Sequence, residues 1–69
     1  MIRYSSEIEK QMHKFYSTLN EKDKRRYAAV EALKLGHGGK KYICEVLGCD
    51  LKTLNKGVKE LNDDPLLNS

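Results

Sequence analysis

The sequence contains no tryptophan, a single proline and two cysteines, and it lacks any long apolar run. A membrane-spanning helix needs about 18 or more consecutive apolar residues, and no stretch approaches that length. The N-terminal segment MIRYSSEIEK lacks the apolar core of a secretory signal peptide. A disulfide-built secreted scaffold usually carries more cysteines in a denser pattern. We therefore expect a cytoplasmic protein that does not contact membranes and whose cysteines remain reduced thiols.

The short chain and its composition exclude several classes of protein. Its 69 residues suffice for one small domain, so a two-domain enzyme is excluded and a large buried catalytic pocket is not expected. Hydrophobic residues make up 39% of the chain and charged residues 33%, which indicates a foldable protein with a mixed-sign surface rather than a disordered tail. The net charge of +3 is too small to identify a partner, so the placement of the basic residues is more informative.

The pattern of apolar residues predicts helices and no strands. Neither a strand-like alternation nor an Asn-Gly or Asp-Gly hairpin signal occurs, and glycines separate segments with the spacing of amphipathic helices. Ser5 or Ser6, Asn20 and Asp50 can each accept a hydrogen bond from an unpaired backbone N–H at a helix start. We predict one all-α domain over residues 1–69, with helices at about 6–19, 21–35, 40–47 and 51–62 and a flexible tail at 63–69.

The apolar stripes of the predicted helices identify the candidate core. They consist of Ile8, Met12, Phe15 and Leu19 in the first helix, Tyr27, Val30 and Leu33 in the second, Tyr42, Ile43, Val46 and Leu47 in the third, and Leu51, Leu54, Val58 and Leu61 in the fourth. Three alanines, Ala28, Ala29 and Ala32, keep other faces of the second helix small, so that neighbouring helices can pack closely. We therefore expect the second helix to be the central one.

Only Gly48 and Cys49 separate the third and fourth predicted helices, which forces a sharp turn between them. Gly48 can adopt the positive φ that ends the third helix, and Asp50 can cap the fourth. Cys44 is expected to be buried where the two helices cross closely, with Cys49 partly accessible at the turn. These features predict a small four-helix domain that contains a helix-turn-helix of the homeodomain-like or Trp-repressor-like type.

The exposed face of the fourth predicted helix carries basic residues. At about 100° per residue, Lys52, Lys56 and Lys59 cluster almost opposite the apolar stripe. In a helix-turn-helix the start of this helix meets base edges in the major groove, where lysine reaches guanine and asparagine pairs with adenine. Lys59 and the start of the third helix, behind the loop glycines, are expected to bind phosphate. The predicted DNA-binding residues are Lys52, Thr53, Asn55, Lys56, Lys59, Lys40 and Lys41.

Two motifs carry a resemblance to a known family: residues 25–39, RRYAAVEALKLGHGG, and residues 47–53, LGCDLKT. They are similar to the N-terminal region of the Rhodopirellula-type DDE transposases of insertion sequences, and the resemblance extends over residues 19–61. It implies a helix-turn-helix that binds the terminal DNA of the mobile element during transposition, a form of DNA recombination. The catalytic part of that family lies downstream and uses acidic metal ligands. The resemblance therefore implies that this chain has no enzyme activity and no cofactor of its own.

Other interpretations of the same residues stay open. The lysine face could be an ordinary solvated surface, and the basic run at 22–26 could contact flanking DNA or only solvent. A protein-interaction module, a homodimer formed through the first helix, or a small transcriptional regulator of the same fold would share these features. A zinc site could be drawn only from His13, His37, Cys44 and Cys49. Its spacing fits no familiar ligand pattern, and a nucleophile made of Cys49 and His37 would lack an oxyanion hole, so we expect no metal and no catalytic residue.

Overall fold

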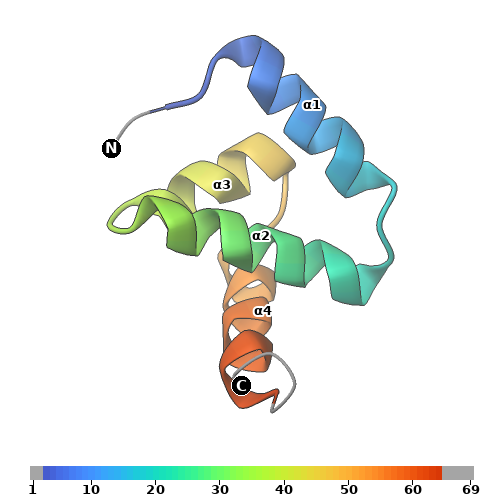
Figure 1. The fold of residues 1–69 in the computed structure, drawn as a ribbon, viewed down its shortest axis with the longest axis vertical. Helices are drawn as coiled ribbons and strands as arrows, with labels where there is room; N and C mark the ends of the chain where they lie inside the picture. The colour runs from blue at the N-terminus through green and yellow to red at the C-terminus, as the bar shows by residue number, and fades with distance from the viewer. Residues whose placement is uncertain (1–2, 65–69) are drawn as a thin grey trace.

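The computed structural model describes residues 3–64, and these form four α-helices and no strand (Figure 1). The helices are α1 (Ser6–Ser17), α2 (Glu21–Leu35), α3 (Gly39–Leu47) and α4 (Leu51–Asp63). The predicted all-α architecture is confirmed. The predicted tail at 63–69 is wrong at its start, because Asp63 belongs to α4; residues 65–69 lie outside the described residues.

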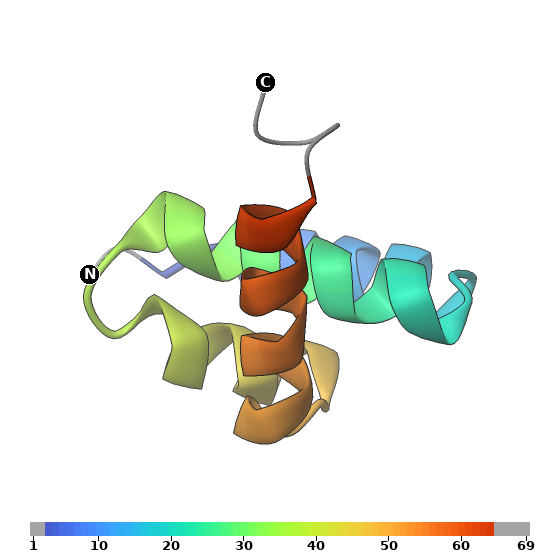
Figure 2. The same ribbon diagram turned by 90° about the horizontal axis from the view of Figure 1, so that it is seen from below.

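The helix α2 lies at the centre of the arrangement, as the sequence predicts. Figure 1 shows α3 running antiparallel beside α2, whereas α4 crosses α2 steeply. Figure 2 shows the same crossing from below. The helix α2 makes its most extensive contacts with α4 and α3, and α1 packs mainly on α3. Among the helices of residues 3–64, none covers one long side of α4.

Local hydrogen bonds explain where the helices begin and end. The side chains of Ser5, Asn20 and Asp50 accept hydrogen bonds from backbone N–H groups at the starts of α1, α2 and α4, which confirms the predicted caps. The predicted end of α1 at residue 19 is two residues too late. The Thr18 hydroxyl donates to the Phe15 carbonyl at 2.7 Å, and the Thr18 N–H donates to the same oxygen at 3.0 Å. These bonds tighten the last turn and end the helix at Ser17.

The buried core contains three alanines of α2. Its members are Met12, Ala28, Ala29, Ala32, Tyr42, Ile43, Leu47 and Leu54. The prediction that Val30 and Leu33 face the core is wrong, since these side chains are 44% and 51% exposed. The physical reason is the close approach of both α3 and α4 to α2, which leaves room only for methyl-sized side chains on the facing surface.

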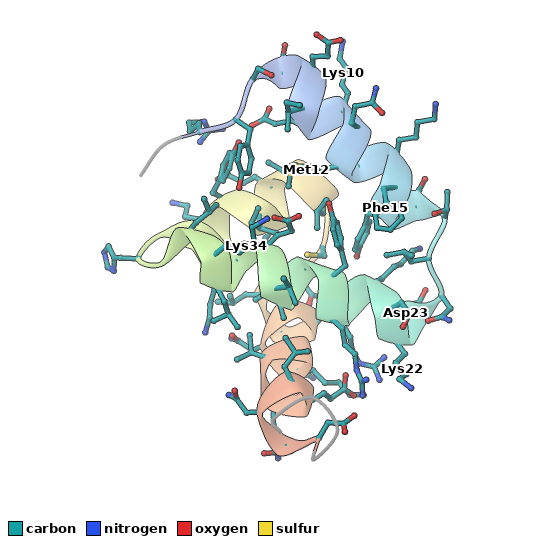
Figure 3. The ribbon with its side chains drawn as sticks, viewed as in Figure 1. Lys10, Met12, Phe15, Lys22, Asp23 and Lys34 are labelled. Atoms are coloured by element: carbon teal, nitrogen blue, oxygen red, sulfur yellow. The ribbon has the colours of Figure 1, made fainter. Side chains whose placement is uncertain are left out.

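The helix α1 buries only part of its predicted stripe. Met12 is 8% exposed and lies between α1 and α3 (Figure 3), while Ile8 and Phe15 are 49% and 52% exposed. The ring of Phe15 contacts Tyr27 of α2 edge-on, with the ring centroids 5.2 Å apart. The first helix therefore folds back onto this chain but keeps large apolar groups at the surface.

A buried tyrosine ties the N-terminal segment to α3. The Tyr42 hydroxyl accepts a hydrogen bond from the Tyr4 N–H at 2.9 Å and donates one to the Glu9 carboxylate. The Arg3 guanidinium lies 4.4 Å from the centroid of the same ring. Since Glu9 belongs to α1, this network holds both the preceding segment and α1 against α3.

Gly57 marks the point where α4 crosses α2. It is buried, and a β-carbon at this position would overlap the Arg25 backbone carbonyl and lie 3.2 Å from the Ala29 side chain. The glycine lets the two helix backbones approach each other directly. A larger residue would push α4 away from α2.

We expect Gly57→Ala to destabilise the protein, although alanine in place of glycine inside a helix ordinarily stabilises it by about 0.5–1 kcal/mol. The overlap with the α2 backbone should outweigh that gain and lower the free energy of unfolding by about 1–3 kcal/mol. Urea denaturation followed by circular dichroism measures the change. Asn55→Ala, on the exposed side of the same helix, is the control and should not be destabilised. If the Gly57→Ala protein were more stable than the parent protein, the close approach of α4 to the α2 backbone at Gly57 would be contradicted.

Candidate nucleic-acid interface

The turn between α3 and α4 has the geometry that the sequence predicts at Gly48. This glycine has a φ of 75°, and the N–H groups of Gly48 and Cys49 both donate to the Cys44 carbonyl, at 2.9 and 3.2 Å. This pattern is a Schellman-type ending, in which the side chain four residues before the glycine contacts the side chain directly after it. A short, hydrogen-bonded turn of this kind defines how α4 departs from α3.

The prediction that Cys44 is buried is wrong, because Cys44 and Cys49 are both half-buried. Their Sγ atoms lie 3.9 Å apart, in the place where such a turn usually brings two apolar side chains together. Burial and, secondly, the neighbouring Cys44 raise the pKa of the Cys49 thiol to about 11. The two thiols therefore act as small apolar groups within the turn.

Two arginines of α2 hold α4 at its crossing angle. The Arg25 guanidinium donates two hydrogen bonds of 2.7 Å to the Glu60 carboxylate, and Arg26 lies 3.4 Å from Glu60 and 3.7 Å from Asp64. The hydrogen bonds from Arg25 are the main reason that the pKa of Glu60 falls to about 2. The two arginines of the basic run at 22–26 are mostly buried and form ion pairs within the fold. This arrangement does not favour the expectation that they contact DNA.

The unpacked side of α4 presents most of the DNA-binding residues predicted on this helix. Lys52, Asn55, Lys56 and Lys59 are all exposed, whereas Thr53 is half-buried and its N–H donates to the Asp50 carboxylate at 2.7 Å. The buried Leu54 and Gly57 lie on the opposite side of the helix and face α2 and α3. The packing of α4 therefore turns three lysines and an asparagine outward together.

The lysines at the start of α3 belong to a different part of the surface. Lys40 and Lys41 are exposed and line an open groove of about 760 Å³ together with Leu33 of α2 and Leu51 of α4. No side chain caps α3, whose N-cap residue is Gly38. The groove thus joins the start of α3 to the start of α4.

The far end of the lysine face has mixed charge. Lys56 and Lys59 line a shallow depression with Arg26 and the carboxylates of Glu60, Asp63 and Asp64. The structure therefore separates the seven predicted residues into a basic part at the start of α3 and α4 and a partly neutralised part near the end of α4.

The five lysines among the predicted DNA-binding residues form no salt bridge within the described residues, unlike Arg25, Arg26 and Lys34. An unpaired lysine is not by itself a sign of an interface, because Lys10 on α1 and Lys22 on α2 also lack such a bridge in residues 3–64 and point to solvent (Figure 3). The distinguishing feature is the gathering of Lys52, Lys56 and Lys59 on one unpacked helix side.

Sequence reasoning missed two features that position this surface. The ion pair between Arg25 and Glu60 joins residues that are 35 positions apart, so no local sequence pattern predicts it. The close approach at Gly57 did have a signal, because a glycine inside an otherwise regular helical stripe often marks close packing. The half-exposed Leu51 was also assigned to the core stripe, and the structure places it at the rim of the groove instead.

Within residues 3–64, no three or more His, Cys, Asp or Glu side chains are placed to share a metal ion. Of the two histidines, His13 lines a depression between α1 and α3, and His37 lines the groove beside the cysteines. In the same range no helix combines the length and apolar character of a membrane span. No family model matches the chain. No curated protein and no solved structure matches it either.

The raised pKa of the Cys49 thiol predicts that this residue is alkylated slowly in the folded protein. Since the thiolate is the reacting form, iodoacetamide should alkylate the folded Cys44→Ser variant more slowly at pH 8 than the same variant unfolded in urea. Because burial is the main cause of the raised pKa and remains in this variant, the folded-state rate should continue to rise with pH above pH 8.5, where a free thiol levels off. Mass spectrometry at a series of pH values measures both rates. Equal rates in the folded and unfolded protein would contradict the burial of this thiol.

The lowered pKa of Glu60 predicts a loss of stability in acid. Because the folded-state pKa is about 2 and the ordinary value is 4.5, the stabilisation is complete above pH 4.5 and is lost as the pH falls toward 2. We expect Glu60→Gln to be less stable than the parent protein at pH 7, and this difference should shrink below pH 4.5. Urea denaturation at several pH values measures it.

Glu45→Gln is the matched control, since Glu45 is exposed and forms no salt bridge with residues 3–64. Its stability should follow that of the parent protein at every pH. If the difference between Glu60→Gln and the parent stayed constant from pH 7 to pH 2, the ion pair with Arg25 would not be its source.

Proposed function

We propose that this chain is a DNA-binding module in which α3 and α4 form a helix-turn-helix and α4 enters the major groove. The observation that carries the proposal is the unpacked side of α4, where three lysines and an asparagine are exposed together and form no salt bridge with residues 3–64. The crossing of α4 over α2 supports it, because a recognition helix must project from the body of its domain.

The exposed residues differ in the contacts that they are suited to make. Lys52, Asn55 and Lys56 lie in the first half of α4, which in this arrangement faces base edges. Lys59 lies further along and is assigned to phosphate. Lys40 and Lys41 stand at the uncapped start of α3, where backbone N–H groups and the helix dipole attract a phosphate. Thr53 is half-buried beside its cap, so we assign it a supporting contact.

We further propose that the module is the DNA-recognition region of an insertion-sequence transposase, or of a truncated copy of one, acting in the cytoplasm without a catalytic step of its own. The motifs at residues 25–39 and 47–53 support this more specific proposal. A small transcriptional regulator of the same fold would bind DNA by the same physical means. Selection of binding sites from random duplexes distinguishes them, because transposase sites lie at the inverted ends of an element.

The second candidate function is a protein-interaction or homodimerisation module. The observation in its favour is the exposure of Ile8 and Phe15 on α1, two large apolar side chains half open to solvent. An apolar helix interface depends weakly on salt, whereas DNA binding through lysines weakens steeply as salt rises. Sedimentation at several protein concentrations, combined with the titrations below, separates the two.

We expect the Lys52→Ala/Lys56→Ala double variant to lose most of the preference for a selected duplex over a random one. Loss of a base contact costs about 1–3 kcal/mol on the preferred site, whereas loss of a phosphate contact weakens all sequences alike. Lys41→Ala should therefore weaken both duplexes evenly and reduce the salt slope by about 0.9. Fluorescence anisotropy titrations on both duplexes at two salt concentrations measure these effects.

The control is Lys10→Ala/Lys14→Ala, which removes the same charge from the exposed surface of α1. This variant should keep the preference for the selected duplex and change its affinity only slightly. Equal losses in the two double variants would mean that total charge, and not the α4 surface, determines binding. If the Lys52→Ala/Lys56→Ala protein bound both duplexes as the parent protein does, α4 would not be the recognition helix.

A further inference from the structure

Leu51 is the first residue of α4, and its position is unusual for a large apolar side chain. It is 51% exposed, although the helical pattern of the sequence places it in line with the buried Leu54. It lines the groove of about 760 Å³ on the α4 side, opposite Leu33 of α2. The core therefore does not use most of its surface.

The groove beside Leu51 is lined mainly by apolar groups, among them Ala32 and Leu33, and also by lysines. Lys40 and Lys41 line the same groove, and Lys52 follows directly in sequence. The acidic groups nearby are Glu45, which also lines the groove, and Asp50, whose carboxylate accepts the hydrogen bond that caps α4. A groove that combines apolar groups with lysines fits a ligand that is anionic overall and carries a small apolar group.

Duplex DNA presents one such group in its major groove, the C5-methyl of thymine. Residues at the start of a recognition helix are the ones that reach base edges. One helical turn separates Leu51 from Asn55, so the two side chains lie on the same side of α4. An asparagine suited to adenine and a leucine suited to a thymine methyl would thus face neighbouring base pairs.

We propose that Leu51 is a specificity-determining residue that reads thymine by packing against its C5-methyl in the major groove. This inference rests on the proposed DNA-binding function. It adds a base preference that the lysines do not supply, since lysine reaches the acceptor atoms of guanine. It also accounts for an exposed leucine at the start of α4.

The experiment removes the methyl group from the DNA and nothing else. A duplex is first selected from a random pool by the parent protein, and each thymine is then replaced singly by deoxyuridine. Anisotropy titrations at two salt concentrations compare the affinities. We expect one or two of the replacements to weaken binding by the parent protein about fourfold, as for the loss of one buried methyl group.

Leu51→Ala should bind the thymine and deoxyuridine duplexes with equal affinity. Because Leu51 is half exposed, this variant should remain folded, which its thermal melting curve checks. Ile8→Ala, which truncates an equally exposed side chain on α1, is the matched control and should keep the full discrimination between the two duplexes.

The outcomes separate this inference from the function on which it rests. Salt-dependent binding to a selected duplex with no effect of any deoxyuridine replacement, or a selected site without thymine, would overturn the role of Leu51 and leave the DNA-binding function standing. An undiminished deoxyuridine effect in Leu51→Ala would assign the methyl contact to another residue. Absence of salt-dependent DNA binding in the parent protein would overturn both, and the groove would then suit an acidic protein segment instead.

Discussion

The direct contact between the backbones of α2 and α4 at Gly57 is the constraint on which the rest of the structure depends. With no side chain at that point, α4 lies against the Arg25 carbonyl and the Ala29 methyl group. The paired hydrogen bonds from Arg25 to Glu60 then act about one turn further along α4 and oppose its rotation about the crossing. Since an apolar contact alone permits sliding and rotation, the combination of close approach and directional bonds is what orients the exposed side of α4.

The small side chains on the inner face of α2 have a consequence for the whole surface. Ala28, Ala29 and Ala32 let two helices approach α2 closely, but each buries little apolar area. The larger side chains of the same helix, Val30 and Leu33, are displaced to the outside. A domain built in this way has a thin core and several exposed apolar groups, and it depends on hydrogen-bonded caps, the Tyr42 network and the arginine pairs to hold its helices in place.

The basic residues of the protein divide by chemistry. Arg25 and Arg26 are used inside the fold, where a planar guanidinium can bind one carboxylate through two hydrogen bonds. The residues of the α4 surface are lysines, whose compact, well-hydrated charge is stable in water without a fixed partner. The ion pairs of these arginines with Glu60 and Asp64 remove equal numbers of positive and negative charges, so the net charge of +3 comes from the remaining groups, among which exposed lysines gather on α4.

Much of the secondary structure could be predicted from the sequence because local interactions determine it. The caps at Asn20 and Asp50 and the turn at Gly48 involve residues only a few positions apart, so the number of helices and most of their limits could be predicted. The outward placement of Lys52 and Lys56 also follows from helical spacing alone, once the buried side of α4 is known. Which apolar side chains are buried, and how α4 crosses α2, were decided by tertiary packing. The exposure of Leu51 and the pairing of Arg25 with Glu60 depend on contacts between distant segments, and hydrophobic periodicity carries no information about how closely two helices approach.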